Sequence, residues 1–326
     1  MAKRFKTIKK VGPEEFGLGN SARCTAMQSA TERPRARVGE IIIYGSLILL
    51  LMTGTYWRNR VWNSKLGLWT DCVKKSPNKD RPHNNLGIAY TDERKYQEAI
   101  AQFSEALRIN PNFGEAYNNL GSVYTLQRKY QEAIAQFSEA LRINPYDPEV
   151  HNNLGSIYAY QGRYREAAVQ FTEALQIDPR YAEAHYNLGK VYIRQGGYQE
   201  AIAQFTEALR INPNYAEAHN NLGNTYTEQG RYREAIAQFT EALRINPNFA
   251  EVHNNLGNAY IEQGRYREAI AQFTEALRIN PNYAEAHYNL GIAYFAIGDS
   301  NSAFKEYQIL SKINPGLASD FYRKTK

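Results

Sequence analysis

Apolar and small side chains recur along most of the chain in two alternating patterns. In the first pattern Leu and Tyr stand four residues apart, as Leu86 and Tyr90 do. In the second pattern Ala, Phe and Ala follow one another at spacings of four and three, as in Ala99, Phe103 and Ala106. Such spacings place side chains on one face of an α-helix. The alternation therefore predicts pairs of amphipathic helices.

The two patterns together form a unit of 34 residues with a proline near its end, at position 32. Numbered from Asp80 as position 1, each unit should hold helices at roughly positions 2–14 and 18–30. A unit of this length cannot bury its apolar face alone, so the copies must stack into a solenoid. The prolines that mark the period are Pro111, Pro145, Pro179, Pro213, Pro247, Pro281 and Pro315.

The motif Leu-Gly-x-x-Tyr, then Ala-x-x-x-Phe-x-x-Ala, then Pro, resembles the tetratricopeptide repeat. The resemblance implies an all-α, right-handed superhelical solenoid of seven helix-turn-helix repeats. That family usually carries Trp at position 4, where this chain has His or Tyr. The expected repeats are residues 80–113, 114–147, 148–181, 182–215, 216–249, 250–283 and 284–315, with a capping segment at 316–326.

Two features of the repeat predict local backbone geometry. Position 8 is always Gly, as in Gly87 and Gly121. A glycine inside a helix costs about 1 kcal/mol relative to Ala, so we expect a close contact with the second helix that any Cβ would disturb. The second helix ends at Ile-Asn-Pro in most repeats. We expect its Asn to adopt a left-handed conformation, because Asn tolerates it and Pro cannot continue the helix.

The chain before the repeats divides into three segments. Residues 1–37 are basic and lack an apolar period, which predicts disorder. Residues 38–57 include an uncharged run of 17 residues, near the lower limit for crossing a bilayer, and predict one transmembrane helix. The alternatives are a buried helix and a cleaved signal peptide. Residues 58–79 form a linker, in which residues 64–76 have the apolar spacing of a helix that caps the first repeat.

Charge is concentrated before the repeats. Residues 1–79 hold 15 Lys and Arg against five Asp and Glu, whereas residues 80–326 hold 24 against 28. The repeats therefore lack the basic face that nucleic acid requires, and we expect no nucleic-acid partner. The two cysteines, Cys24 and Cys72, are too few for a disulfide framework.

All histidines occupy position 4 of a repeat. Packed helices lie about 8–10 Å apart, whereas zinc needs its nitrogen ligands at about 2.0–2.1 Å. Tyr117 takes the same position in the second repeat. We therefore expect a packing role for the histidines and no metal or other cofactor. They are His83, His151, His185, His219, His253 and His287.

A row of asparagines is the strongest candidate for binding. Position 6 is Asn in all repeats: Asn85, Asn119, Asn153, Asn187, Asn221, Asn255 and Asn289. Positions 5 and 9 add Asn220, Asn254, Asn224 and Asn258. On a helical wheel these positions lie away from the core, on the face that lines the concave groove of tetratricopeptide solenoids. Since an amide has two donors and an acceptor, such a row could clamp the backbone of an extended peptide.

The row is similar to the asparagine ladder of O-GlcNAc transferases. The alternative is that the amides only cap or solvate locally and were copied with the repeat. Position 2 is Glu in six repeats. Either the helix dipole stabilises Glu near the helix N-terminus, or these glutamates make the groove prefer basic or neutral peptides. The family's carboxylate clamp, in which Lys and Arg grip C-terminal acids, is not matched, because Arg81 and Lys190 are isolated.

No phosphate-binding Gly loop, Cys–His pair or isolated carboxylate pair is present in the sequence, and we expect no enzyme. The sequence predicts a single-pass, membrane-anchored scaffold that binds an extended protein or peptide partner. The junction Thr55-Tyr-Trp-Arg-Asn-Arg-Val-Trp resembles that of transmembrane-and-tetratricopeptide glycosyltransferase-like proteins, whose repeats lie on the non-cytoplasmic side. The alternative is therefore a C-terminal fragment or accessory subunit of such a system that recognises acceptor proteins. A soluble scaffold is a third option.

Overall fold

The computed structural model describes residues 42–53, residue 56 and residues 62–326. The chain divides into two units, residues 1–63 and 64–326, which are described separately. In the first unit residues 42–53 are helical, and their side chains are exposed. Among the described residues no helix combines the length and the apolar character needed to cross a bilayer. The predicted span 38–57 lies only partly within these residues and segment 1–37 lies outside them, so both stay predictions.

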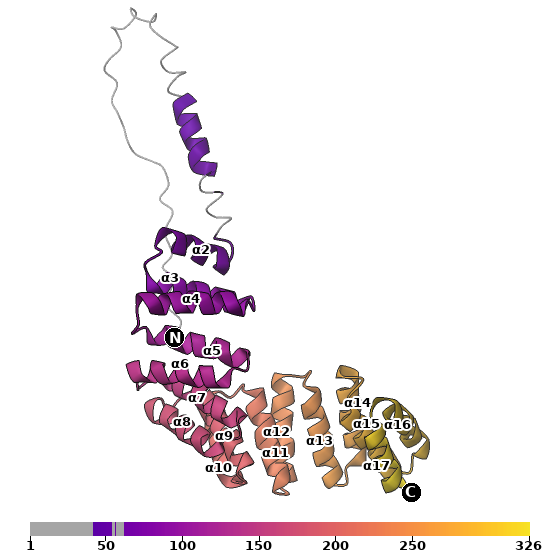
Figure 1. Ribbon diagram of the computed structural model, residues 1–326. Helices are drawn as coiled ribbons and strands as arrows, with labels where there is room; N and C mark the ends of the chain where they lie inside the picture. Colours follow the sequence, from indigo (N-terminus) through magenta and orange to yellow (C-terminus); the bar gives the residue numbers. More distant parts are fainter. Residues whose placement is uncertain (1–41, 54–55, 57–61) are drawn as a thin grey trace, which may run out of the picture. The chain divides into compact units, whose positions relative to one another are not determined.

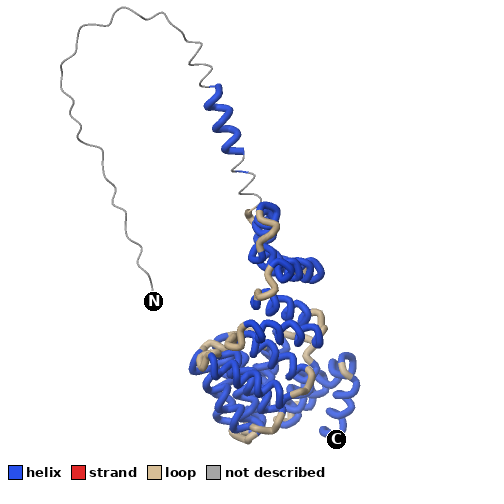
Figure 2. The backbone as a smooth tube through the Cα atoms, turned by 60° about the vertical axis from the view of Figure 1, so that its left-hand side comes forward, coloured by secondary structure: helices blue, strands red, loops and turns tan. Residues whose placement is uncertain are grey.

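The second unit, all of which the structure describes, consists of α-helices without strands (Figure 1). Successive pairs of antiparallel helices are joined by short loops, and the tube view shows the same stack from another side (Figure 2). The predicted all-helical solenoid is confirmed. We call α3, α5, α7, α9, α11, α13 and α15 the first helices of the repeats, and α4, α6, α8, α10, α12, α14 and α16 the second helices.

The helices begin one residue earlier than the apolar pattern predicts. The first helices are α3 (Asp80–Asp92), α5 (Gly114–Leu126), α7 (Pro148–Tyr160), α9 (Ala182–Arg194), α11 (Ala216–Glu228), α13 (Ala250–Glu262) and α15 (Ala284–Ala296). The second helices are α4 (Tyr96–Ile109), α6 (Tyr130–Ile143), α8 (Tyr164–Ile177), α10 (Tyr198–Ile211), α12 (Tyr232–Ile245), α14 (Tyr266–Ile279) and α16 (Ser300–Ile313).

A further helix lies at each end of this array. Helix α2 (Lys65–Lys75) matches the helix predicted over residues 64–76, and the hydroxyl of Ser64 caps it by accepting a hydrogen bond from the N–H of Gly67. Helix α17 (Pro315–Thr325) packs on the last repeat. Its Phe321 stacks on Tyr307 with ring centroids 6.0 Å apart and is buried. Each terminal helix thus covers apolar surface that has no further repeat beside it.

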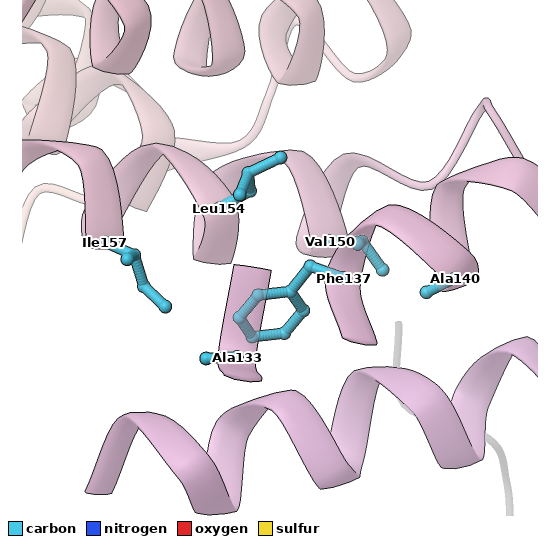
Figure 3. Close-up of a cluster of buried hydrophobic side chains, with 6 residues drawn as sticks. All are labelled: Ala133, Phe137, Ala140, Val150, Leu154 and Ile157. Atoms are coloured by element: carbon cyan, nitrogen blue, oxygen red, sulfur yellow. The ribbon is translucent and has the colours of Figure 1, made fainter. Parts of the chain in front are cut away.

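The core forms between repeats as well as within them. Ala133, Phe137 and Ala140 of α6 pack with Val150, Leu154 and Ile157 of α7 (Figure 3). The Phe of each second helix from Phe103 to Phe273 is at most 1% exposed, with Ala on both sides of it. Because this ring contacts both its own first helix and the following one, adjacent repeats share a continuous core.

The glycine at position 8 makes room for that phenylalanine. A Cβ on Gly223 would lie 2.6 Å from Cε1 of Phe239, and the corresponding distances in the first six repeats are 2.5–2.8 Å. Real Cβ atoms do not approach a ring carbon this closely. The predicted close contact between the glycine and the second helix is confirmed.

The prediction of a left-handed Asn at the end of each second helix is wrong. Asn110 is extended, with φ −132° and ψ 92°, and its Oδ1 accepts a hydrogen bond from the N–H of Asn112 at 3.1 Å. This side-chain turn ends the helix without left-handed backbone. The left-handed residue is instead position 15, in the turn between the two helices. It is Arg94 or Arg128 in the first two repeats and Gly162, Gly196, Gly230, Gly264 or Gly298 in the others.

We expect Arg94→Gly and Arg128→Gly to stabilise the protein. Both arginines have φ near 60°, where a side chain strains the backbone by about 1–2 kcal/mol, while Gly loses more entropy on folding. The net gain should be about 0.5–1 kcal/mol for each substitution, measured by urea denaturation. The reverse change Gly230→Arg serves as the control and should destabilise by a similar amount. Unaltered unfolding midpoints in all three variants would contradict the strain.

Candidate peptide-binding face

The asparagines at position 5 are buried between neighbouring first helices. Asn220 is 4% exposed and Asn254 is 5% exposed, which differs from the expectation that both line an open groove. The reason is that the next repeat covers them, which a helical wheel of one helix cannot show. The amide of Asn220 donates to Oε1 of Glu251, at position 2 of the next repeat, at 3.3 Å. Asn84, Asn118 and Asn152 donate to the corresponding glutamates at 3.0–3.4 Å.

The asparagines at position 6 are half-buried, and six of the seven donate to the preceding repeat. The Nδ2 atoms of Asn119, Asn153, Asn187, Asn255 and Asn289 lie 2.9–3.1 Å from the Oδ1 of the preceding position-5 Asn. Asn221 donates to the hydroxyl of Tyr186 instead, at 2.9 Å. Amides and glutamates thus connect successive first helices. This arrangement gives the row a stabilising role that needs no ligand.

The remaining candidate asparagines have no partner among residues 64–326. Asn85 opens the row and has no Asn in a preceding repeat to bind. Asn224 and Asn258 at position 9 are half-buried, and their side chains form no hydrogen bond within this unit. In the position-6 residues Oδ1 accepts no hydrogen bond within the same unit, so each keeps an acceptor. The prediction that these groups clamp a peptide backbone therefore stays open.

The histidines connect the two helices of a repeat to the end of the preceding unit. In His219, Nδ1 lies 2.7 Å from Oε1 of Gln238 and Nε2 lies 3.3 Å from the carbonyl oxygen of Pro213. A glutamine can turn its amide to donate to Nδ1, so a neutral imidazole satisfies both contacts by donating from Nε2. This hydrogen-bonded packing accounts for position 4. No cluster of three metal-ligating side chains occurs in the part of the chain that the structure describes.

His287 differs because its partner is a carboxylate. Its Nδ1 lies 2.6 Å from Oε2 of Glu306, and its Nε2 lies 3.0 Å from the carbonyl oxygen of Pro281. Both partners are acceptors, so only the imidazolium can donate to both. The hydrogen bond to Glu306 raises the pKa of His287, and this outweighs the opposing effect of burial.

We expect this pair to make the stability of the last repeat depend on pH. Because the folded-state pKa of His287 is raised, its stabilisation is complete below about pH 6.5 and is lost as pH rises through the folded value. The loss cannot exceed about 1.4 kcal/mol per pH unit. Glu306→Gln restores the His–Gln pair of the other repeats and should remove this dependence. Urea unfolding of both proteins between pH 5.5 and 8.5 checks it, and parallel pH profiles would contradict it.

A cavity of about 420 Å³ opens on the face of the first helices between α7 and α9. Tyr160 and Tyr164 line one side, and Asn187, Lys190 and Arg194 line the other. The ammonium of Lys190 lies 5.1 Å from the centroid of the Tyr186 ring. Partial desolvation, and then repulsion from Arg194, lowers the pKa of Lys190. Lys190 is therefore not isolated, contrary to the expectation above, because Arg194 follows it on the same helix, and their spacing of four residues is a signal visible in the sequence.

A second cavity, also about 420 Å³, lies on the same face towards the C-terminal end. It is lined by Asn258, Asn289 and Glu262, with Lys324 of α17 at its edge. Glu262 accepts a hydrogen bond from the hydroxyl of Tyr232 at 3.2 Å. We define the first-helix face as the surface formed by positions 2, 6, 9, 12 and 13 of the first helices. Both cavities lie on it, and it presents polar side chains that the core does not use.

Stacked helix pairs that present a polar face define the class of helical-repeat scaffolds. Family models described as TPR repeat match residues 155–196, 190–228, 223–264 and 257–298, and two described as tetratricopeptide repeat match residues 84–148 and 285–316. These matches together cover well over half of the chain. The chain belongs to the tetratricopeptide-repeat family. The matches do not extend to the likeness with O-GlcNAc transferases or with the glycosyltransferase-like junction.

Solved structures of other repeat proteins are similar to this chain. YrrB, a TPR protein with an unusual peptide-binding site, is 25% identical with a TM-score of 0.51, over 57% of this chain and 97% of its own. A chain of the APC/C hetero-tetramer Cut9–Hcn1 is 24% identical with a TM-score of 0.61, over 72% of this chain. The match spans only 46% of that longer chain. PilF of Pseudomonas aeruginosa is 22% identical with a TM-score of 0.59, over 65% of this chain and 97% of its own. No curated protein matches the chain.

Proposed function

We propose that this protein is a non-enzymatic scaffold that binds an extended segment of a partner protein along its first-helix face. The observation that carries the proposal is the pair of cavities on that face, whose lining includes Lys190, Arg194 and Asn258, side chains without a hydrogen bond or ion pair among residues 64–326. Fold similarity to YrrB, a TPR protein with an unusual peptide-binding site, supports peptide binding as the function to test. A rigid array of first helices would bind such a segment without paying to order itself.

Site-specific photo-crosslinking tests this proposal. Benzoylphenylalanine would replace Ala159, which lines the first cavity, or Val169, which is 56% exposed on the second helix of the same repeat. Twelve-residue peptides selected from a random phage library on the full chain serve as probes. We expect cross-links from position 159 and few from position 169. Equal labelling at both positions, or labelling at 169 alone, would reject the first-helix face.

We also propose that residues 38–57 hold the protein at a membrane as a single-pass anchor. The support is the uncharged run from Ile41 to Trp57 and the exposure of the apolar side chains in its helical part, residues 42–53. The glycosyltransferase-like junction favours repeats on the non-cytoplasmic side, where they would recognise acceptor proteins. Protease protection of a C-terminal tag in sealed vesicles tests both points. A tag that never sediments with membranes would reject the anchor.

A further inference from the structure

Charge on the first-helix face is divided among the repeats. Position 2 carries Glu in six repeats, and position 13 adds Asp92 on α3, Glu228 on α11 and Glu262 on α13. The central helix α9 differs at positions 9 and 13, where it carries Lys190 and Arg194 in addition to Glu183 at position 2. In the other repeats position 9 holds Ile, Ser or Asn. A basic spot on α9 is therefore followed by acidic side chains on the next two first helices.

The two basic side chains of α9 form no ion pair within residues 64–326, although Glu183 lies near enough to attract Lys190. Neither Lys190 nor Arg194 forms an ion pair or hydrogen bond with any of residues 64–326, whereas Arg163 pairs with Glu166 at 3.0 Å. Like charges four residues apart on a helix repel one another. Repulsion contributes to lowering the pKa of Lys190, as described above. An anionic group placed between the two would relieve this repulsion.

The cavity beside Lys190 and Arg194 is large enough for one peptide side chain together with the adjoining residues of the peptide. The cavity of about 420 Å³ lies directly against Lys190, Arg194 and Asn187, with Tyr160 and Tyr164 opposite. Such a mixed aromatic and basic lining suits a carboxylate side chain on an extended backbone better than a free inorganic anion, which would leave the aromatic wall unused. Glu183 also lines the cavity, accepts a hydrogen bond from Asn152 at 3.4 Å and attracts Lys190, so the cavity keeps an excess of one positive charge and suits a single carboxylate.

The spacing of the repeats fixes how many ligand residues separate the basic pair of α9 from the acidic residues Glu228 and Glu262. Packed helices are about 8–10 Å apart, and a polyproline II chain advances about 3.1 Å per residue with three residues per turn, so one repeat corresponds to about one turn of ligand. With a carboxylate at α9, the side chains three and six residues away point to the same face and lie near Glu228 and Glu262. Basic side chains fit those two places.

We propose that the first-helix face selects an extended peptide with one Asp or Glu and with Lys or Arg three and six residues away, both towards the same end of the peptide. The acidic side chain binds Lys190 and Arg194, and the basic side chains bind Glu228 and Glu262. This inference rests on the proposed binding function and specifies its ligand. It differs from a C-terminal carboxylate site, because the acid is a side chain within the segment.

Peptide selection tests the pattern without assuming the chain direction. Random twelve-residue phage peptides are selected on the immobilised full chain and sequenced. The expected result is enrichment of one acidic residue with basic residues at three and six positions on one side. Enriched peptides without that spacing would overturn the charge pattern and leave groove binding intact. Failure to enrich any peptide above a bare support would reject both the pattern and the proposed function.

Charge reversal then identifies the residues. The best selected peptide, labelled with fluorescein, should bind Lys190→Glu/Arg194→Glu about tenfold or more weakly by fluorescence anisotropy, and the same peptide with Lys in place of its acid should recover affinity for that variant. The matched control is Arg233→Glu/Arg267→Glu, which changes net charge equally on second helices. Equal weakening in the control would show general electrostatic attraction and overturn the inference. Circular dichroism confirms that each variant is folded.

Discussion

Replacing Gly223 with Ala should destabilise the protein by up to about 2 kcal/mol. Two effects oppose each other at this position. Ala is favoured over Gly inside a helix by about 1 kcal/mol. The new methyl group, however, would lie 2.6–2.9 Å from three carbons of the Phe239 ring, which is fully buried and cannot move away. Overpacking of this kind costs about 1–3 kcal/mol, so it should exceed the gain in helix propensity.

Two further variants distinguish a local clash from a general intolerance of Ala. Gly114 begins α5, its Cβ would meet only ordinary contacts at 3.6 Å or more, and later repeats carry Ala at the same position. Gly114→Ala should therefore be neutral or slightly stabilising. Phe239→Leu should make Gly223→Ala less harmful, so the double variant loses less stability than the two single losses combined. Urea unfolding monitored by circular dichroism measures these four variants and the unchanged protein. Additive losses would contradict the clash.

The fold of residues 80–315 follows closely from the sequence, since its determinants are local and occur many times. Leu86, Ala99 and Phe103 mark the buried faces of two helices, and the prolines fix the period. The glycine contact was also predictable, because a conformationally costly residue at a constant place on a helix needs a reason. In these cases the information lies within one repeat or in the requirement that identical repeats stack.

The details of the candidate face depend on how one repeat lies against the next, which a single repeat does not contain. A helical wheel places positions 5 and 6 on the same outward side of the helix, yet Asn220 is buried and Asn221 is half-buried. The difference arises because the following first helix covers position 5. Likewise, the left-handed residue in each turn was missed because Arg94 and Arg128 occupy it in the first two repeats. Their presence conceals the glycine preference that the later repeats reveal.

Two candidate asparagines four residues apart should behave in opposite ways when replaced with Ala. Asn220 is 4% exposed, donates to Glu251 and accepts from the amide of Asn255 at 3.1 Å. Its removal takes a partner from the half-buried amide of Asn255 and from the carboxylate of Glu251, and the two lost hydrogen bonds should cost about 1–3 kcal/mol. Asn224 forms no hydrogen bond within residues 64–326, so Asn224→Ala should change stability by less than about 0.5 kcal/mol.

The same pair separates a structural amide row from a ligand-binding one. If the first-helix face binds peptide backbone, Asn224→Ala should weaken binding of the selected peptide several-fold, while the protein keeps its unfolding midpoint. Asn220→Ala should lower the unfolding midpoint in urea, whether or not its affinity for the peptide changes. Both quantities are obtained on the full chain, by urea unfolding and by fluorescence anisotropy. A stable Asn220→Ala variant with lost binding would instead mean that the buried amides reach the ligand, and that the row clamps the peptide directly.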